Sequence, residues 1–201
     1  AAGKDGKAYS IKPTDGTGDF TFSRGSNLAA TRVGADGLIE KGRENLLVQS
    51  NQFDTTWVSI NVTESGGHSG YDGSSNAWLL TKSSANGRLY QNISYSGVNT
   101  FSIYLKKNDS DWARLYFDII NISAYIDLRD GSFGGTDSVI IDKKIVSLGS
   151  DWYRVSITMS GSGTTARVYP ADGDGDTSGT SGSIYIQDAQ VELGLAATEV
   201  I

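Results

Sequence analysis

Hydrophobic and polar residues alternate with a period of two along most of this chain, which is the pattern of β-strands that bury one face. The stretch "TFSIYLKKNDSDWARLYFDI", residues 100–119, shows this pattern twice. Phe101, Ile103 and Leu105 alternate with polar neighbours, and after a polar turn a second apolar set begins at Leu115. The stretch therefore predicts two short strands that each direct one face to a core.

Similar alternating segments recur along the chain, separated by Gly, Asn, Asp and Ser clusters that are typical of turns. Helical periodicity is almost absent. Many short strands at this spacing predict an all-β fold, an antiparallel β-sandwich of the jelly-roll type. The predicted strands are Asp19–Ser23, Ala30–Val33, Leu38–Lys41, Asn76–Thr81, Arg88–Ser94, Thr100–Lys106, Ala113–Ile119, Ala124–Leu128, Lys144–Ser147, Tyr153–Ser160, Thr165–Tyr169 and Ser183–Leu193.

The composition changes near Arg43–Leu47 and divides the chain into two parts. Residues 1–42 contain few large apolar side chains and predict an extended and hairpin segment, in which "TRVGADGLIEK" forms one hairpin with its turn at Gly34–Gly37. Such a segment cannot bury a core by itself, so we expect it to pack on the main domain or on another copy of the chain. Residues 45–201 predict the jelly-roll domain.

Composition and charge exclude several classes of function. The chain has 201 residues, a net charge of −6 and an isoelectric point near 4.7, which disfavours a nucleic-acid partner because phosphate binding needs clustered Lys and Arg. Cysteine is absent, which excludes disulfides, thiolate catalysis and zinc sites built on cysteine. No apolar run approaches the ~20 residues that span a bilayer, so we expect no membrane insertion.

The sequence shows no strong signal for catalysis. His68, the only histidine, lies in "SGGHSGYDG", whose glycines predict a solvated loop, and no G-x-S-x-G motif is present. A pair of catalytic aspartates is the alternative that the residues leave open. The five glutamates are scattered: Glu40, Glu44, Glu64, Glu192 and Glu199. We therefore expect no enzyme.

The acidic stretch "DGDGDT", residues 172–177, begins like a calcium-binding loop. It departs from the EF-hand pattern because Thr177 stands where glycine is required and Ser183 where the bidentate glutamate belongs. An acidic solvated loop is the simpler interpretation, and a calcium-binding turn of another type is the alternative.

The polar residues of strands 100–106 and 113–119 include a tyrosine and a cation on each strand. If a close turn at Lys107–Trp112 pairs these strands as a hairpin, two rings and two cations form one patch, with a tryptophan at its rim. Aromatic planes beside polar donors suit sugar rings, whose C–H bonds stack while their hydroxyls form hydrogen bonds. The candidate ligand-binding residues are Tyr104, Lys106, Arg114, Tyr116, Trp78 and Trp112.

Several motifs in this order resemble a known family. "ENLLVQSNQFDTTWVS", "NTFSIYLKK", "GSDWYRVSITM" and "SIYIQDAQVELG" resemble the outline of jelly-roll carbohydrate-binding modules. The ending "AQVELG…AT" is similar to domains of bacteriophage tail and other virion proteins. "GDFTFSRGS…ATRVGADGLIE" resembles the segment that often precedes the module in those phage proteins.

The resemblance implies a non-catalytic domain of a phage virion protein, tail-associated or extracellular, that binds host-surface or environmental polysaccharide on one concave sheet. It also implies a structural calcium near the first and last strands, for which Asp54 and Asp188 match the acidic positions most nearly. Gln187 stands where related modules pair a second aspartate with Asp188.

Two alternatives remain open beside glycan binding. The first is a purely structural domain that contacts other virion subunits or a second copy of the chain. The second is a jelly-roll polysaccharide lyase. A jelly-roll alginate lyase is expected to carry a Gln-x-His motif, whereas Gly66 and Gly67 precede His68 here, which counts against the lyase.

Overall fold

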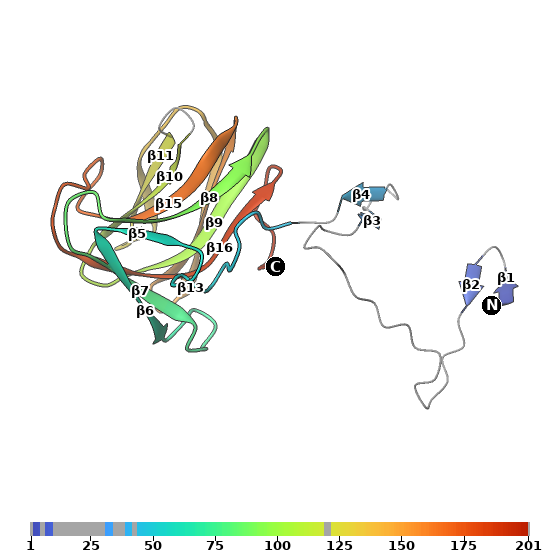
Figure 1. Cartoon of the computed structure of the whole chain (residues 1–201), viewed down its shortest axis with the longest axis horizontal. Coiled ribbons are helices and arrows are strands. Elements are labelled where there is room, and N and C mark those ends of the chain that lie inside the picture. Colours follow the sequence, from blue (N-terminus) through green and yellow to red (C-terminus); the bar gives the residue numbers. More distant parts are fainter. Residues whose placement is uncertain are drawn as a thin grey trace.

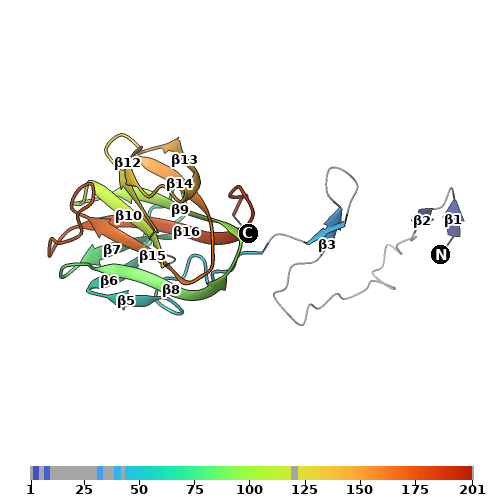
Figure 2. The ribbon, with the colours of Figure 1, turned by 90° about the horizontal axis from the view of Figure 1, so that it is seen from above.

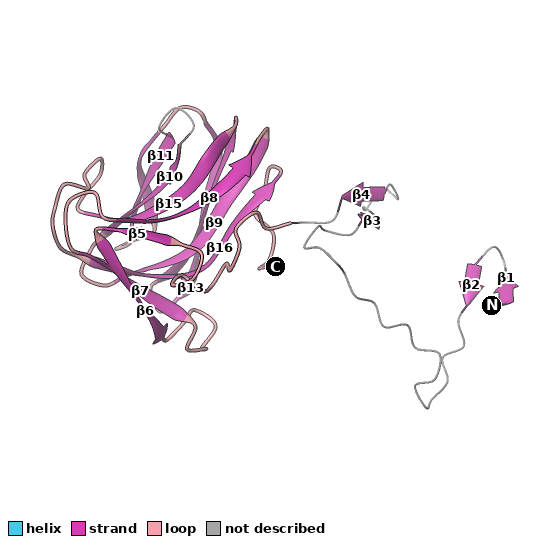
Figure 3. Cartoon of the chain, viewed as in Figure 1, coloured by secondary structure: helices cyan, strands magenta, loops and turns pink. Residues whose placement is uncertain are grey.

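The computed structural model describes residues 44–118 and 122–200 in full, and the backbone of four short strands in the preceding segment. Figure 3 shows that the described chain is made of strands joined by loops. Among the described residues no helix is long and apolar enough to cross a membrane.

The strands follow one another in chain order from β1 to β16 (Figure 1). Their bounds are β1 Ala2–Lys4, β2 Lys7–Tyr9, β3 Thr31–Val33, β4 Ile39–Lys41, β5 Val58–Ile60, β6 Val62–His68, β7 Ala77–Lys82, β8 Arg88–Tyr95, β9 Val98–Lys107, β10 Trp112–Phe117, β11 Ile122–Asp127, β12 Ser132–Thr136, β13 Ile140–Gly149, β14 Trp152–Ser160, β15 Gly163–Ala171 and β16 Ser183–Leu193.

Strands β5 to β16 form two six-stranded antiparallel sheets that pack face to face (Figures 1 and 2). The sheet ordered β13-β14-β9-β16-β7-β6 is called the β9 sheet, and the sheet ordered β12-β11-β10-β15-β8-β5 is called the β10 sheet. Their central strands, β7-β16-β9-β14 and β8-β15-β10-β11, follow the strand order of a jelly roll. The predicted all-β, antiparallel jelly-roll sandwich is confirmed.

The alternating apolar residues form the core between the sheets. Phe101, Ile103 and Leu105 of β9 and Leu115 and Phe117 of β10 are all fully buried. Each such side chain contributes about 1.5–3 kcal/mol of transfer free energy. The residues between them point to the outer faces of the sandwich, because successive side chains of a strand alternate in direction.

The short strands before residue 44 form two hairpins, β1 with β2 and β3 with β4. Val33 pairs with Ile39, which confirms the hairpin predicted in "TRVGADGLIEK". The strand predicted at Asp19–Ser23 lies outside the described residues. The proposed division into an N-terminal segment, residues 1–42, and a domain, residues 45–201, stays a prediction.

Every predicted strand from Asn76 onward corresponds to an observed strand, but five strands were missed: β1, β2, β5, β6 and β12. The β6 sequence lacks apolar alternation because it is an edge strand whose residues are mostly exposed. His68 ends this strand, its ring centre lies 5.3 Å from that of Tyr185, and its buried Nε2 has no hydrogen-bond partner among the described residues. The prediction of a solvated loop position for His68 is therefore wrong.

The predicted hairpin of strands 100–106 and 113–119 is also wrong, because β9 and β10 belong to opposite sheets. The connection between them bridges the sandwich. Ser110 N donates to the carbonyl of Ser183 at the start of β16, and Leu128 N, after β11, donates to the carbonyl of Asp111. A short polar turn between alternating segments fits a hairpin and a crossover equally well, so the pattern alone could not distinguish them.

Candidate functional site

The structure divides the predicted ligand-binding residues among the outer faces of the two sheets and, for Trp78, the core between them. Tyr104 and Lys106 lie on the outer face of the β9 sheet, whereas Arg114 and Tyr116 lie on the outer face of the β10 sheet. The single patch predicted from these four residues therefore does not exist.

Trp78 points inward rather than to the rim of either face. It packs against the core, its ring lies edge-on to Phe53 with ring centres 6.0 Å apart, and its Nε1 donates to the carbonyl of Asn51 at 3.0 Å. Trp112 is half-buried and opens the row of outward residues on β10. Of the two predicted rim tryptophans, only Trp112 lies beside a predicted ligand-binding pair.

Two aromatic residues at the centre of the β9 sheet's outer face, Tyr104 and Trp152, are covered by the protein itself. The ring of Tyr71 stacks on that of Tyr104 with centres 3.8 Å apart and planes 2° apart. Tyr104 and Trp152 are only 7% and 2% exposed. Burial raises the pKa of Tyr71, whose hydroxyl donates to Asp188 Oδ2 at 3.0 Å. The plane that a sugar would need on Tyr104 is therefore already occupied.

The chain after β16 covers more of the same face. Thr100 Oγ1 donates to the carbonyl of Gly194 at 2.9 Å, and Thr198 N donates to Glu192 Oε2 at 2.9 Å. Glu192, on the outward side of β16, is only 2% exposed as a result. This face therefore offers little open polar surface along its centre.

The outer face of the β10 sheet carries rings and cations of differing exposure: Tyr116 and Tyr169 are only 7% and 4% exposed, whereas Tyr90, Trp112, Arg114, Tyr125 and Arg167 are half-buried. Arg114 pairs with Tyr125 on one side and Tyr169 on the other, and the next row contains Tyr116 between Ser123 and Arg167. The tyrosine–arginine face is defined as the outward residues Tyr90, Trp112, Arg114, Tyr116, Tyr125, Arg167 and Tyr169.

The Arg114 guanidinium is the centre of this face. Its carbon lies 4.6 Å from the ring centre of Tyr116, 4.9 Å from that of Tyr169 and 5.5 Å from that of Tyr125. Arg114 Nε and Nη2 also donate to Ser123 Oγ, at 3.0 and 2.6 Å. Three rings and a hydroxyl thus fix the orientation of one cation, which is the type of preorganised contact that favours specific binding.

A hollow of about 380 Å³ adjoins the face at Tyr125. Two carboxylates line it, and each accepts a backbone N–H bond: Asp137 from Ser123, and Asp174 from Gly135 at 2.6 Å. Burial raises the pKa of Tyr125, and the positive charge of Arg114 opposes this shift. The remaining lining residues are Gly135, Thr136 and Gly175. The hollow offers oxygen acceptors next to an aromatic plane.

Gly134 of β12 lets the elements around this hollow approach one another. A Cβ at Gly134 would lie 2.7 Å from the Trp112 ring and 2.6 Å from Asp174 Oδ1. Any larger residue would therefore push β12 away from the tyrosine–arginine face. Because Gly134 has no side chain, Trp112 and Asp174 can lie together at the margin of the tyrosine–arginine face.

The loop of residues 172–177 directs its three aspartates to three different partners. Asp172 forms an ion pair with Lys82 at 2.6 Å, Asp174 binds the Gly135 amide, and Asp176 accepts from Ser178 N at 2.8 Å. The carboxylates therefore do not converge on one calcium ion. The loop instead fixes the wall of the hollow.

The two aspartates proposed for calcium do not form a cage with a third acidic ligand. Asp54 is exposed in a turn, whereas Asp188 lies in a bulge of β16 with φ of 47°. Asp188 Oδ2 accepts from the Tyr71 hydroxyl and from Gln187 Nε2, and burial raises the pKa of this carboxyl. Across residues 44–118 and 122–200 no three acidic or histidine side chains converge. Calcium at Asp54 and Asp188 stays a prediction.

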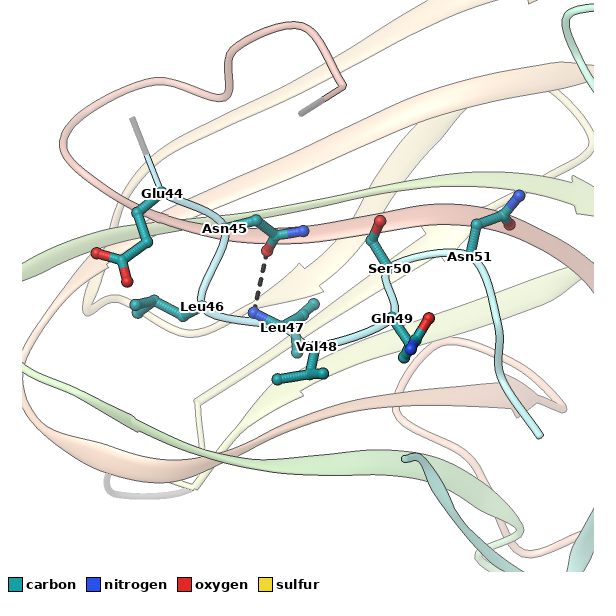
Figure 4. A pocket seen from close by; sticks show the side chains of 8 residues that line it. All are labelled: Glu44, Asn45, Leu46, Leu47, Val48, Gln49, Ser50 and Asn51. Carbon is teal, nitrogen blue, oxygen red and sulfur yellow. Dashed lines mark hydrogen bonds between the residues drawn. The ribbon is translucent and has the colours of Figure 1, made fainter. Parts of the chain in front are cut away.

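A larger hollow, of about 520 Å³, is lined by the single segment 44–51 (Figure 4). Figure 4 shows this segment beside the ribbon of β16, to which Asn45 is bonded through Val191 N and the Ala189 carbonyl. Its lining has no aromatic ring, and Val48 is 53% exposed. It lacks the stacking plane and the cations of the tyrosine–arginine face.

Sequence reasoning missed Tyr90, Tyr125, Arg167 and Tyr169 as site residues. All four lie in strands that were predicted with the right alternation; in β15, for example, Ala166 and Val168 point inward and Arg167 and Tyr169 point outward. The missing information was the strand order. In a jelly roll β15 lies beside β10, and that order brings Arg167 and Tyr169 next to Tyr116 and Arg114.

Comparisons with known proteins give only distant similarities of fold. No protein-family model matches the chain, and no curated protein matches it. The CBM22-1 xylan-binding domain of Xyn10C from Paenibacillus barcinonensis aligns with a TM-score of 0.44 and 13% identity, over 77% of this chain and 94% of that domain. TmCBM61, solved with β-1,4-galactotriose, aligns with a TM-score of 0.43 and 12% identity, over 74% of this chain and 97% of that one.

The enzymatically active domain of tailspike protein 4 from bacteriophage CBA120 aligns with a TM-score of 0.38 and 11% identity. The match covers 73% of this chain but only 21% of that domain. The jelly-roll assignment rests on the strand order itself, and the choice of site rests on the geometry of the tyrosine–arginine face.

Proposed function

We propose that this chain is a non-catalytic glycan-binding module whose saccharide lies on the tyrosine–arginine face of the β10 sheet. One observation supports this most: the Arg114 guanidinium is held among the rings of Tyr116, Tyr125 and Tyr169, beside a hollow lined by oxygen acceptors. Sugar rings bind where an aromatic plane faces their C–H bonds and where polar groups reach their hydroxyls.

The face supplies both kinds of group in adjacent positions. Half-buried Tyr125 offers a ring at the edge of the hollow, while Trp112 offers a second ring at the margin near Asp174. Asp137 and Asp174 accept hydrogen bonds and Arg114 donates them, so a sugar hydroxyl can bind here either as a donor or as an acceptor. Tyr104 and Lys106 are not part of the proposed site, since they lie on the other sheet, where Tyr71 covers Tyr104.

The proposal assigns no catalytic step to the two carboxylates of the hollow. Cleavage of a glycosidic bond needs one carboxyl that is protonated and a second that is charged. Asp137 and Asp174 instead each accept a backbone N–H bond, which holds their carboxylates in place as acceptors at the wall of the hollow. This arrangement suits the recognition of sugar hydroxyls.

The virion setting of this proposal rests on the sequence resemblance to phage tail proteins. In that setting the module would bind host-surface or environmental polysaccharide. An assembly role is the second candidate. Val146 of β13 and Leu195, which follows β16, are 38% and 66% exposed and line one groove of about 120 Å³. Such apolar exposure suits contact with another subunit.

Affinity gel electrophoresis against a panel of neutral and acidic polysaccharides tests the proposal. We expect at least one polysaccharide to retard the protein, and Tyr125→Ala to reduce that retardation at least tenfold. Tyr185→Ala is the matched control, because it removes a half-buried tyrosine from the outer face of the β9 sheet. Melting curves of both variants check that the fold is retained.

Loss of retardation in Tyr185→Ala with full retardation in Tyr125→Ala would move the site to the β9 sheet. Absence of retardation by every polysaccharide would reject glycan binding and favour the assembly role.

A further inference from the structure

The tyrosine–arginine face is positively charged in a protein whose net charge is −6. Arg114 and Arg167 lie on adjacent strands, and Arg88 points outward on the next strand, β8. The two central rows, Tyr125–Arg114–Tyr169 and Ser123–Tyr116–Arg167–Tyr90, contain no acidic residue. Asp127 pairs with Trp112 in the next row, where Arg129 binds it, and Asp137 and Asp174 lie in the adjoining hollow. The two central rows therefore form a cationic patch on an acidic molecule.

These arginines are not neutralised by the described part of the chain. The ion pairs found among residues 44–118 and 122–200 are Lys82–Asp172, Lys107–Asp111 and Arg129–Asp127. Arg114 instead binds the hydroxyl of Ser123, and Arg167 Nε donates to Thr165 Oγ1 at 2.9 Å. Neutral hydroxyls orient the guanidinium groups without cancelling their charge.

The two central cations are close enough to act on one ligand. Their guanidinium carbons lie 4.6 and 4.7 Å from the ring centre of Tyr116, so they are less than about 10 Å apart. This is comparable to the Debye length of ~8 Å at physiological ionic strength, so each charge contributes to the potential at the other. An anionic ligand that reaches both guanidinium groups relieves that repulsion and accepts charge-assisted hydrogen bonds.

Resting on the proposed function, we infer that the ligand is an acidic polysaccharide, with its carboxylates or sulfates bound by Arg114 and Arg167. The guanidinium fork matches the planar carboxylate, and the half-buried ring of Tyr125 stacks on the sugar that carries it. Arg88 extends the cationic patch toward β5 for a neighbouring acidic sugar. A neutral polysaccharide would leave the mutual repulsion of the cations in place.

The test compares a polyuronate with a neutral xylan as immobilised ligands for the full chain. We expect the polyuronate to bind at least tenfold more tightly, and raising NaCl from 50 to 500 mM to weaken that binding at least tenfold, as with other charge-driven associations. The double variant Arg114→Gln, Arg167→Gln should lose at least tenfold in affinity for the polyuronate. Arg167→Gln alone serves if the double variant is unstable.

Lys106→Gln, Lys144→Gln is the matched control, since it removes two cations from β9 and β13 of the β9 sheet and changes the net charge equally. Equal losses in the control would show a nonspecific charge effect and overturn the inference. Salt-independent binding of neutral xylan alone, abolished by Tyr125→Ala, would overturn the acidic ligand while leaving the proposed function standing. Binding of neither polysaccharide, nor of any other in the panel, would reject both.

Discussion

Single residues fix the ends of β15, and Asp118 is the clearest case. Its carboxylate accepts four hydrogen bonds: from Tyr95 OH at 3.0 Å, from Thr164 N at 2.9 Å and Oγ1 at 2.6 Å, and from Thr165 N at 2.9 Å. Burial raises the pKa of Asp118, but these hydrogen bonds outweigh burial and lower it from 3.8 to about 2.

We expect Asp118→Ala to reduce the free energy of unfolding by about 3 kcal/mol at pH 7, because the donors of all these hydrogen bonds lose a charged acceptor. The pKa is lowered in the folded state, so this stabilisation is complete above pH 3.8 and is lost as the pH falls toward 2. Urea titrations of both proteins at pH 7 and pH 2.5 measure the difference. A gap between the two proteins that stays the same at pH 2.5 would contradict this role.

For single residues, the sequence predicted which face of a strand a side chain points to better than it predicted the neighbours of that side chain. Alternation correctly placed Phe101 in the core and Tyr104 and Tyr116 on outer faces. It could not show that Tyr71, 33 positions earlier, stacks on Tyr104. Nor could it show that Trp78 faces inward, because that direction depends on a neighbouring strand. A Cβ at Gly66 of β6 would lie only 3.1 Å from the Trp78 ring, so the glycine leaves room for it.

At the scale of elements, the loop of residues 172–177 is held to the end of the sandwich by a buried ion pair, together with the hydrogen bonds that Gly135 N donates to Asp174 and that Thr177 Oγ1 donates to Asn86. Lys82 Nζ lies 2.6 Å from both carboxylate oxygens of Asp172, and its side chain is fully buried, whereas that of Asp172 is 24% exposed. The two partners therefore differ in how well water can replace the lost bond.

We predict an asymmetric result for the two single variants. Asp172→Ala leaves a buried ammonium without its partner and should cost about 3–5 kcal/mol, while Lys82→Met leaves a carboxylate that water can reach and should cost less than half as much. Chemical denaturation of each variant and of the double variant measures these values. Equal costs, or a larger cost for Lys82→Met, would show that the burial of the Lys82 ammonium does not set the stability lost when the pair is broken.

The elements were predicted more fully than their pairing. Nine predicted strands from Asn76 onward exist, since each has an apolar face that the core requires. The pairing of 100–106 with 113–119 failed because the Ser110 and Asp111 amide and carbonyl bonds tie the connection to both sheets, which no local pattern encodes. Strand β6 escaped detection because an edge strand buries little beyond Val62.

For the whole molecule, the central claim is that one outer face of the sandwich binds glycan and the other does not. The C-terminal segment 194–200 and Tyr71 cover the centre of the β9 sheet's outer face, whereas the outer face of the β10 sheet presents the tyrosine–arginine face. Jelly-roll strand order produces this face by bringing β11, β10 and β15 side by side.

The most direct measurement is the chemical-shift footprint of an oligosaccharide from a polysaccharide that retards the protein. Adding it to the ¹⁵N-labelled full chain should shift the amide signals around Arg114, Tyr125 and Tyr169 most. The signals of β9, β14 and β16 should remain within the scatter of residues far from the ligand. A footprint centred on Tyr104 of β9, or on the segment 44–51, would contradict the assignment of the site to the β10 sheet.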